Sequence, residues 1–298
     1  MRADARREAR AGWLFVLPAF LVLAVFFAGP VVAGFLLGLT DVDIYALGAG
    51  GDWRFVGLKN YARLLSDPLF WQSLRNTVFF VVVGGPLTVG AALGAALLLA
   101  SRRTRLPGLF RTVYFAPVVT TLVAVAAVWR FLYHPTAGPL NLFLGLFGIS
   151  PINWLGDPRW AMPALVLMAV WKNFGYGMVL FVAGIQAIPE SLYEAARIDG
   201  AGPGTQFRRI TLPLLAPTFL FVAVITTIGY FQLFAEPYVM TGGTGGPNNA
   251  TLSVALLMYK QGFRFWNMGA GAATAFVLFL IILAVSTVQI RLQKGRDA

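Results

Sequence analysis

Residues 194–200 read Glu-Ala-Ala-Arg-Ile-Asp-Gly, and residues 210–213, after a gap of nine positions, read Ile-Thr-Leu-Pro. Both runs lie within a polar loop, residues 188–213, that separates two long apolar segments. Each apolar segment is long enough to cross a bilayer as a helix, which takes about 20 residues. The loop is therefore predicted to lie at a membrane surface, and the flanking segments are predicted to be membrane helices.

The 188–213 loop carries signals for two short helices. Pro189 and Glu190 are typical of a helix start, because proline fits the first turn and an acidic group favours the positive end of the helix dipole. Gly200 is predicted to end this helix in a left-handed conformation. Pro203 can start a second short helix, and Pro213 is predicted to open the next membrane helix. The loop is thus expected to fold as a helix–turn–helix.

The composition independently indicates a polytopic membrane protein. Apolar residues make up 58% of the chain, charged residues 12%, and the mean hydropathy is +0.73. The chain has no cysteine and a single histidine, His134, which excludes disulfides, thiolate chemistry and His-based metal clusters. We interpret His134 as a loop residue rather than a proton carrier. The net charge of +11 favours loops at the cytoplasmic face of a membrane over nucleic-acid binding.

Six apolar runs are long enough to span a bilayer. We therefore predict an all-α, polytopic integral membrane protein with six transmembrane helices, near residues 13–39, 74–100, 108–132, 161–187, 213–239 and 269–291. The first run follows a basic tail, as a secretory signal would, but it is too long for one and no Ala-x-Ala site closes it. It is predicted to remain as the first helix.

Basic residues give the predicted orientation. They concentrate in both tails, in the loop after the second span and in the 188–213 loop, so both termini and that loop are predicted to be cytoplasmic. The expected organisation is a tail (1–12), the first helix (13–39), an outer loop (40–73), a core domain of five helices (74–291) and a second tail (292–298).

The pattern Glu-Ala-Ala-x-x-x-Gly, nine residues, then Ile-x-Leu-Pro resembles the signature loop of ABC-importer permeases, which have the type I importer fold. In that family the loop is the docking site for the ATP-hydrolysing subunit. The resemblance implies that the contact is made by Glu194, Ala195, Ala196, Asp199, Gly200 and Ala201. The alternative, without the spacing match, is an ordinary cytoplasmic hairpin.

Two further runs resemble the sugar-importing members of that family. Residues 55–61 read Phe-Val-Gly-Leu-Lys-Asn-Tyr, and residues 234–243 read Phe-Ala-Glu-Pro-Tyr-Val-Met-Thr-Gly-Gly. The second run closely resembles the end of the fifth helix in maltose-type permeases. With the 188–213 loop, the resemblance covers about residues 50–290. It implies a sugar as cargo, such as a di- or oligosaccharide. Read alone, the aromatic residues of the outer loops are typical of an interfacial belt.

The chain lacks a nucleotide-binding motif of its own. The glycine-rich run 242–246 is not followed by Gly-Lys-Ser/Thr, and it is predicted to lie outside the cell. The chain is therefore expected to be a transport subunit rather than an enzyme, with no cofactor bound by it. The resemblance implies ATP and Mg on two partner ATP-binding subunits, a second homologous permease and an extracytoplasmic sugar-binding protein. It places them at the plasma membrane of a prokaryote.

Polar residues inside the predicted helices are candidates for the sugar path. Charges at membrane depth are costly and usually face a cavity or partner, and sugars need rings to stack on and groups to hydrogen-bond. The candidates are Lys172, Asn173, Tyr176, Tyr230, Gln232 and Glu236. The alternative is that these residues only join helices to one another, and Glu236 could simply lie at the outer interface.

Two rival functions remain at this stage. The same scaffold could carry another solute, such as amino acids or peptides, which the run 234–243 disfavours. An ion-coupled secondary carrier would need acidic residues at mid-membrane depth, and helices one, two, three, four and six have none there. That carrier would also leave the 188–213 loop without a role.

Overall fold

The computed structural model describes residues 2–43, 45, 53–101 and 105–294. Within these ranges the chain is helical, with isolated bridges at Thr40–Phe55 and Asp43–Asn267 and no β-strand. The predicted all-α class is confirmed. The chain divides into two compact units. Unit 1 comprises residues 1–67 and 257–279, and unit 2 comprises residues 68–256 and 280–298.

Unit 1 contains the first candidate span, Gly12–Gly38. Its elements are α1 (Arg2–Leu23), η1 (Ala24–Ala28), α2 (Gly29–Gly38), α4 (Lys59–Ser66), η5 (Lys260–Arg264) and the first half of α17 (Met268–Lys294), with α16 (Val254–Tyr259) at its boundary. The buried Asn60 of α4 donates to the carbonyls of Gly38, at 3.0 Å, and Thr40, at 2.7 Å. The predicted outer loop 40–73 thus contains a helix whose amide ties it to the end of the first span.

Unit 2 contains the remaining helices. They are α5 (Pro68–Phe79), η2 (Phe80–Gly84), α6 (Gly85–Ala100), α7 (Pro107–Val119), α8 (Leu122–Leu132), α9 (Pro139–Gly145), α10 (Pro158–Gln186), α11 (Glu190–Ile198), α12 (Pro203–Gln206), η3 (Phe207–Thr211), α13 (Leu212–Leu214), α14 (Ala216–Phe231), α15 (Ala235–Met240), η4 (Pro247–Asn249) and the second half of α17. The carboxylate of Asp157 caps α10 by accepting from the Arg159 N–H at 2.9 Å. The hydrogen bonds from Arg159 hold the pKa of Asp157 below its usual value.

Four long helices confirm the first, second, fourth and sixth predicted spans: Gly12–Gly38, Pro68–Ala100, Pro158–Gln186 and Met268–Leu292. The other two predicted spans are not continuous helices. The pair α7 and α8 is bent by 99°, and the segment Pro203–Leu214 meets α14 at 64°. The described residues therefore offer six candidate spans if each bent pair counts as one.

The two bends have local causes. Thr120 and Thr121 have extended backbones, with ψ of 138° and 140°, a conformation that suits β-branched residues. They separate α7 from α8. The fifth helix begins at Ala216 rather than at Pro213, because Pro217 has no N–H to donate to the carbonyl four residues before it. Hydropathy alone predicted residues 108–132 and 213–239 as unbroken helices, and both predictions were wrong: the bend at Thr120 and Thr121 divides the first, and residues 232–234 separate α14 from α15 in the second.

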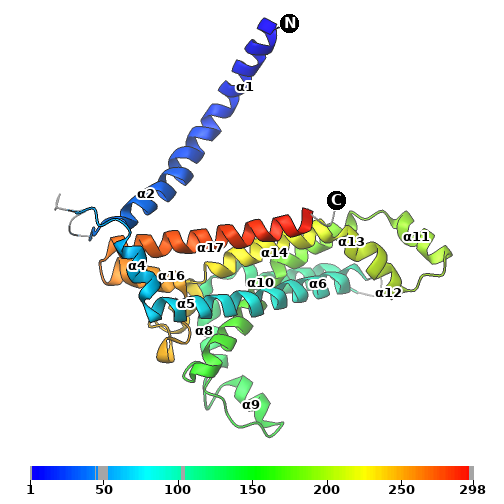
Figure 1. Cartoon of the computed structure of the whole chain (residues 1–298). Coiled ribbons are helices and arrows are strands. Elements are labelled where there is room, and N and C mark those ends of the chain that lie inside the picture. Colours follow the sequence, from blue (N-terminus) through cyan, green and yellow to red (C-terminus); the bar gives the residue numbers. More distant parts are fainter. Residues whose placement is uncertain (1, 44, 46–52, 102–104, 295–298) are drawn as a thin grey trace. The chain divides into compact units, whose positions relative to one another are not determined.

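The core of unit 2 lies where α6, α10 and α14 pack together (Figure 1). A methyl group added at Gly177 of α10 would lie 3.0 Å from the Ala92 Cβ and 3.1 Å from a Val222 methyl carbon. Small residues thus let the three helices approach closely. Figure 1 also shows α11–α13 at the end of unit 2 where α6 and α10 end and α14 begins.

Candidate functional site

The 188–213 loop forms the predicted helix–turn–helix. α11 begins at Glu190, directly after Pro189, and α12 begins at Pro203. Gly200 has a φ of +75° and no atom within 4 Å of the position a Cβ would take. The predicted left-handed helix end is confirmed, and its cause is backbone conformation rather than crowding. We call the segment from α11 through η3 the 190–211 hairpin.

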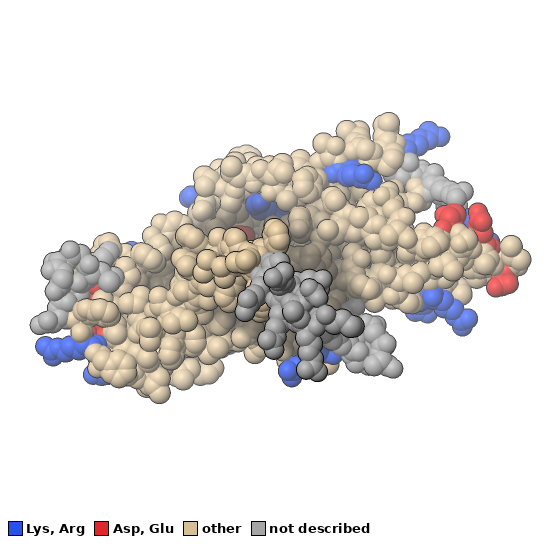
Figure 2. All heavy atoms as spheres, turned by 90° about the horizontal axis from the view of Figure 1, so that it is seen from above, with Lys and Arg blue, Asp and Glu red and all other residues tan. Residues whose placement is uncertain are grey.

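The residues predicted to dock an ATPase lie on accessible surface. Glu194, Ala195, Asp199 and Gly200 are exposed, and Ala196 and Ala201 are half-buried. No residue of α11 is buried. Charged side chains of both signs gather at this end of unit 2 (Figure 2), including an exposed ion pair of 3.1 Å between Arg197 and Glu190. The arrangement leaves one short helix available to another protein, and the docking role stays a prediction.

Hydrogen bonds hold the hairpin at both ends. At the turn, the Gln206 amide donates to the Ala201 carbonyl at 2.8 Å, and the Ala201 N–H donates to the Ala196 carbonyl, also at 2.8 Å. At the open end, the hydroxyls of Tyr193 and Thr211 share a hydrogen bond of 2.9 Å. The hairpin is therefore a defined local structure and not an extended loop.

A second candidate site lies among the spans of unit 2, around Tyr230 of α14. The Tyr230 side chain is buried, and its hydroxyl shares a hydrogen bond of 2.6 Å with Thr88 of α6. The ring packs on Phe80, with centroids 4.8 Å apart. A methyl group at Gly84 would lie 3.0 Å from this ring, so the glycine makes room for it. Tyr230 thus joins α14 to the α5–α6 segment.

Three more predicted path residues lie on α10 and α15 of the same unit. Asn173 of α10 interacts with the Tyr230 hydroxyl. The Lys172 ammonium lies 3.5 Å from the Val118 carbonyl, in the last turn of α7 before the bend. Glu236 lies in α15, which packs against α8, and the charges of Glu236 and Lys172 attract each other. We call Thr88, Lys172, Asn173, Tyr230 and Glu236 the Tyr230 cluster.

The other two predicted path residues differ in their surroundings. Tyr176 of α10 is 47% exposed, and Gln232 is exposed at the end of α14, where its N–H donates to the Ile228 carbonyl at 3.3 Å. Both stay predictions. Sequence reasoning missed Thr88, although a threonine in the middle of an apolar helix is a signal that could have drawn attention to it.

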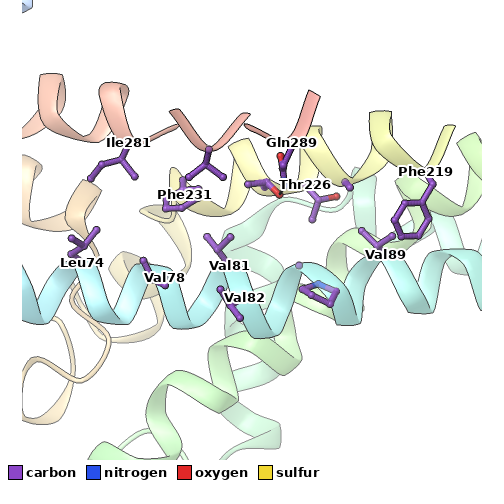
Figure 3. Close-up of a pocket in the computed structure, with 15 residues that line it drawn as sticks. Leu74, Val78, Val81, Val82, Val89, Phe219, Thr226, Phe231, Ile281 and Gln289 are labelled. Carbon is purple, nitrogen blue, oxygen red and sulfur yellow. Dashed lines mark hydrogen bonds between the residues drawn. The ribbon is translucent and has the colours of Figure 1, made fainter. Parts of the chain in front are cut away.

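Unit 2 also contains a cavity of about 640 Å³ that the sequence did not indicate. Its walls come from α5, η2, α6, α14 and α17 and are almost entirely apolar (Figure 3). The polar groups at its wall are Thr226, Thr227 and Gln289, and the Gln289 amide donates to the Thr227 hydroxyl at 2.9 Å. Tyr230 is not among its lining residues.

In the described residues, no group of three or more His, Cys, Asp or Glu could hold a metal ion.

Comparisons with known sequences agree on one family of transport proteins. The family model "Binding-protein-dependent transport system inner membrane component" matches residues 87–297. The chain is 40% identical to the lactose transport system permease protein LacF of Rhizobium radiobacter, over 93% of this chain and 92% of that protein. It is 37% identical to the trehalose/maltose transport system permease protein MalF of Thermococcus litoralis, over 97% and 96%.

Comparison with solved structures supports the fold. A bacterial ABC transporter involved in the import of the acidic polysaccharide alginate has a TM-score of 0.73 at 20% identity, covering 98% of each chain. An amino acid ABC transporter crystallised with histidines has a TM-score of 0.53 at 19% identity, covering 80% of this chain and 98% of that one. At these identities the likeness concerns the fold alone.

Proposed function

The chain belongs to the family of binding-protein-dependent transport system inner membrane components, and we propose that it forms half of the path through which an ATP-driven importer carries a sugar. The family membership, with relatives named for lactose and for trehalose/maltose at 37–40% identity, carries the proposal. The cargo is a sugar such as a di- or oligosaccharide. Amino acids or peptides as cargo, and an ion-coupled carrier, are not favoured, because the curated relatives include sugar permeases over nearly the whole chain.

The 190–211 hairpin is the proposed contact with the ATP-binding subunits. Its helix α11 has no buried residue, and the half-buried Ala196 and Ala201 have short side chains that let another surface approach closely. ATP and Mg would bind to two partner subunits. Closure of those subunits on ATP would move the hairpins and open the path outward, and hydrolysis would reset it.

The Tyr230 cluster is the proposed lining of the sugar path, together with Tyr176 and Gln232. It combines an aromatic ring, an amide and two opposite charges on helices that come from different parts of the chain. Sugars present C–H faces that pack on rings and hydroxyls that need donors and acceptors. The cluster offers both kinds of group, and this chemistry is what supports the proposed role.

The remaining partners follow from the family. A second, homologous permease would complete the path, and an extracytoplasmic sugar-binding protein would deliver the cargo to the outer loops. The multi-pass chain would lie in the plasma membrane of a prokaryote with both termini in the cytoplasm. Six spans are few to enclose a sugar, so the path is proposed to lie between the two permeases.

Reconstitution tests the proposal. The chain is co-produced with the second permease, the ATP-binding subunits and the binding protein, and the complex is placed in proteoliposomes with a panel containing lactose, maltose and trehalose. Uptake is expected only with ATP and the binding protein present, and the purified chain alone is expected to show no ATP hydrolysis. Sugar uptake by this chain alone, driven by an ion gradient without ATP, would remove the importer proposal.

A further inference from the structure

α11 has few means of holding its own position. It has nine residues, none of them buried, and isolated helices of this length are not stable in water. Its ion pair between Glu190 and Arg197 is exposed on both sides, and such pairs contribute little. Tyr193 is the residue that reaches inward, because its half-buried side chain bonds to the buried Thr211.

The Tyr193–Thr211 bond closes the open end of the 190–211 hairpin. The other end is already fixed at the turn by the bonds of Gln206 and Ala201. Without the hydroxyl pair, α11 would be joined to η3 chiefly through the turn, which contains the left-handed Gly200. With the pair in place, the two arms of the hairpin are connected at both ends and move together.

Thr211 also stands at the junction with the membrane helix. Its carbonyl accepts from the Leu215 N–H at 2.9 Å, and Leu215 is buried at the 64° bend into α14. Across from it, a methyl group at Gly184 of α10 would lie 2.8 Å from a Leu215 methyl carbon. A displacement of η3 is therefore delivered to a tightly packed point at the start of α14, the helix that carries Tyr230.

We propose that the hydrogen bond between Tyr193 and Thr211 is a positioning brace that transmits movement of α11 to α14. The inference rests on the proposed docking of ATP-binding subunits at α11. Neither residue needs to touch ATP or sugar. Their hydroxyls hold the docking surface of α11 and the start of α14 together, so that the two elements move as one rigid body.

The test uses the complete complex in proteoliposomes and measures sugar uptake and ATP hydrolysis separately. Tyr193→Phe and Thr211→Val each remove one hydroxyl and little volume. We expect the ATP-binding subunits to co-purify as with the unaltered chain, while sugar transported per ATP hydrolysed falls about fivefold or more, the lower end of coupling between distant sites. Thr211→Ser keeps a hydroxyl and is expected to restore coupling. Thr112→Val removes a hydroxyl at an exposed position of α7, outside the hairpin; it is the matched control and should leave coupling unchanged.

A cross-link separates a loss of coupling from a loss of folding. The chain has no cysteine, so Tyr193→Cys with Thr211→Cys can be joined by a short bis-maleimide in cysteine-free partner subunits. Joining is expected to raise the transport per ATP of the same preparation toward the unaltered value. Unaltered coupling in both single variants, or no gain on joining, would overturn the brace and leave the docking proposal intact. Release of the ATP-binding subunits from Tyr193→Phe would also overturn it. Absence of ATP-dependent uptake by the unaltered complex would instead contradict the proposed function.

Discussion

The 190–211 hairpin is exposed and is held by bonds between residues close together in the chain, whereas the Tyr230 cluster lies among apolar spans and joins residues far apart. Within the hairpin, the side-chain hydrogen bond that spans the most sequence joins Tyr193 and Thr211, which are 18 positions apart. In the cluster, Thr88 and Tyr230 are 142 positions apart, and Lys172 and Val118 are 54 apart. Exposed positions of α11 can thus be altered without removing a contact between membrane helices, but a change in the cluster acts on path and packing together.

The largest effect is expected from the hairpin. Gly200→Val places a β-branched residue at a φ of +75°, which costs roughly 1–2 kcal/mol, and Glu194→Lys reverses an exposed charge on α11. Both variants should insert normally, because neither residue lies in a span, and both should lose transport, with the ATP-binding subunits released or hydrolysing without sugar control. Pull-down from detergent paired with uptake measures this. Gly108→Ala, at an exposed position of α7 outside the hairpin with no close neighbour, is the control. Wild-type uptake in both variants would remove the docking assignment.

The next effect is expected from the charges of the cluster. Lys172→Met removes a donor to the Val118 carbonyl and the positive charge that acts on Glu236. The variant should lose stability by about 1.5 kcal/mol, the low end of the range for hydrogen bonds to charged groups, because the 3.5 Å contact is long. Adding Glu236→Gln should recover part of the loss. Thermal unfolding of the purified complex measures both, and a double variant less stable than Lys172→Met would contradict the charge interaction.

A smaller effect is expected from the uncharged polar residues of the proposed path. Tyr230→Phe keeps the ring on Phe80 and removes the hydroxyl that bonds to Thr88, and a hydrogen bond of this kind contributes about 1 kcal/mol. Tyr230→Phe and Thr88→Val should each lower uptake severalfold, and together no more than either alone. Asn173→Ala and Gln232→Ala should change which sugar stimulates ATP hydrolysis. Unaltered uptake and selectivity in all of them would favour a role in packing only.

The smallest effect is expected from the ion pair between Glu190 and Arg197. Both side chains are about half exposed, and such pairs contribute about 0–1 kcal/mol, less at high salt. Glu190→Gln should therefore change the stability of the complex by less than about 1 kcal/mol. Thermal unfolding at low and high salt measures this. A larger loss at low salt would show that the pair, and not only Tyr193, holds α11 in place.

The same contrast explains what the sequence could predict. The end of α11 at Gly200 and the start of α12 at Pro203 were predicted correctly, because both depend on local backbone chemistry. The bend at Thr120 and Thr121 was missed, because hydropathy indicates how long an apolar run is and carries no information about its backbone angles. The partners of Tyr230 and Lys172 were not predicted, because they depend on which helices pack together. The start of the fifth helix was misplaced because Pro213 and Pro217 are both compatible with a helix start.

The bend between α7 and α8 has a consequence for changing the cargo of this transporter. A helix that breaks inside a bilayer leaves carbonyls without their usual partners, and the Lys172 side chain reaches one of them at Val118. A substitution of Lys172 would therefore disturb the packing of the bent helix before it altered any preference among cargoes. Libraries intended to redirect selectivity should keep Lys172 and vary its neighbour Asn173, whose side chain interacts with Tyr230. The break in one helix thus decides which of two adjacent positions is suited to engineering.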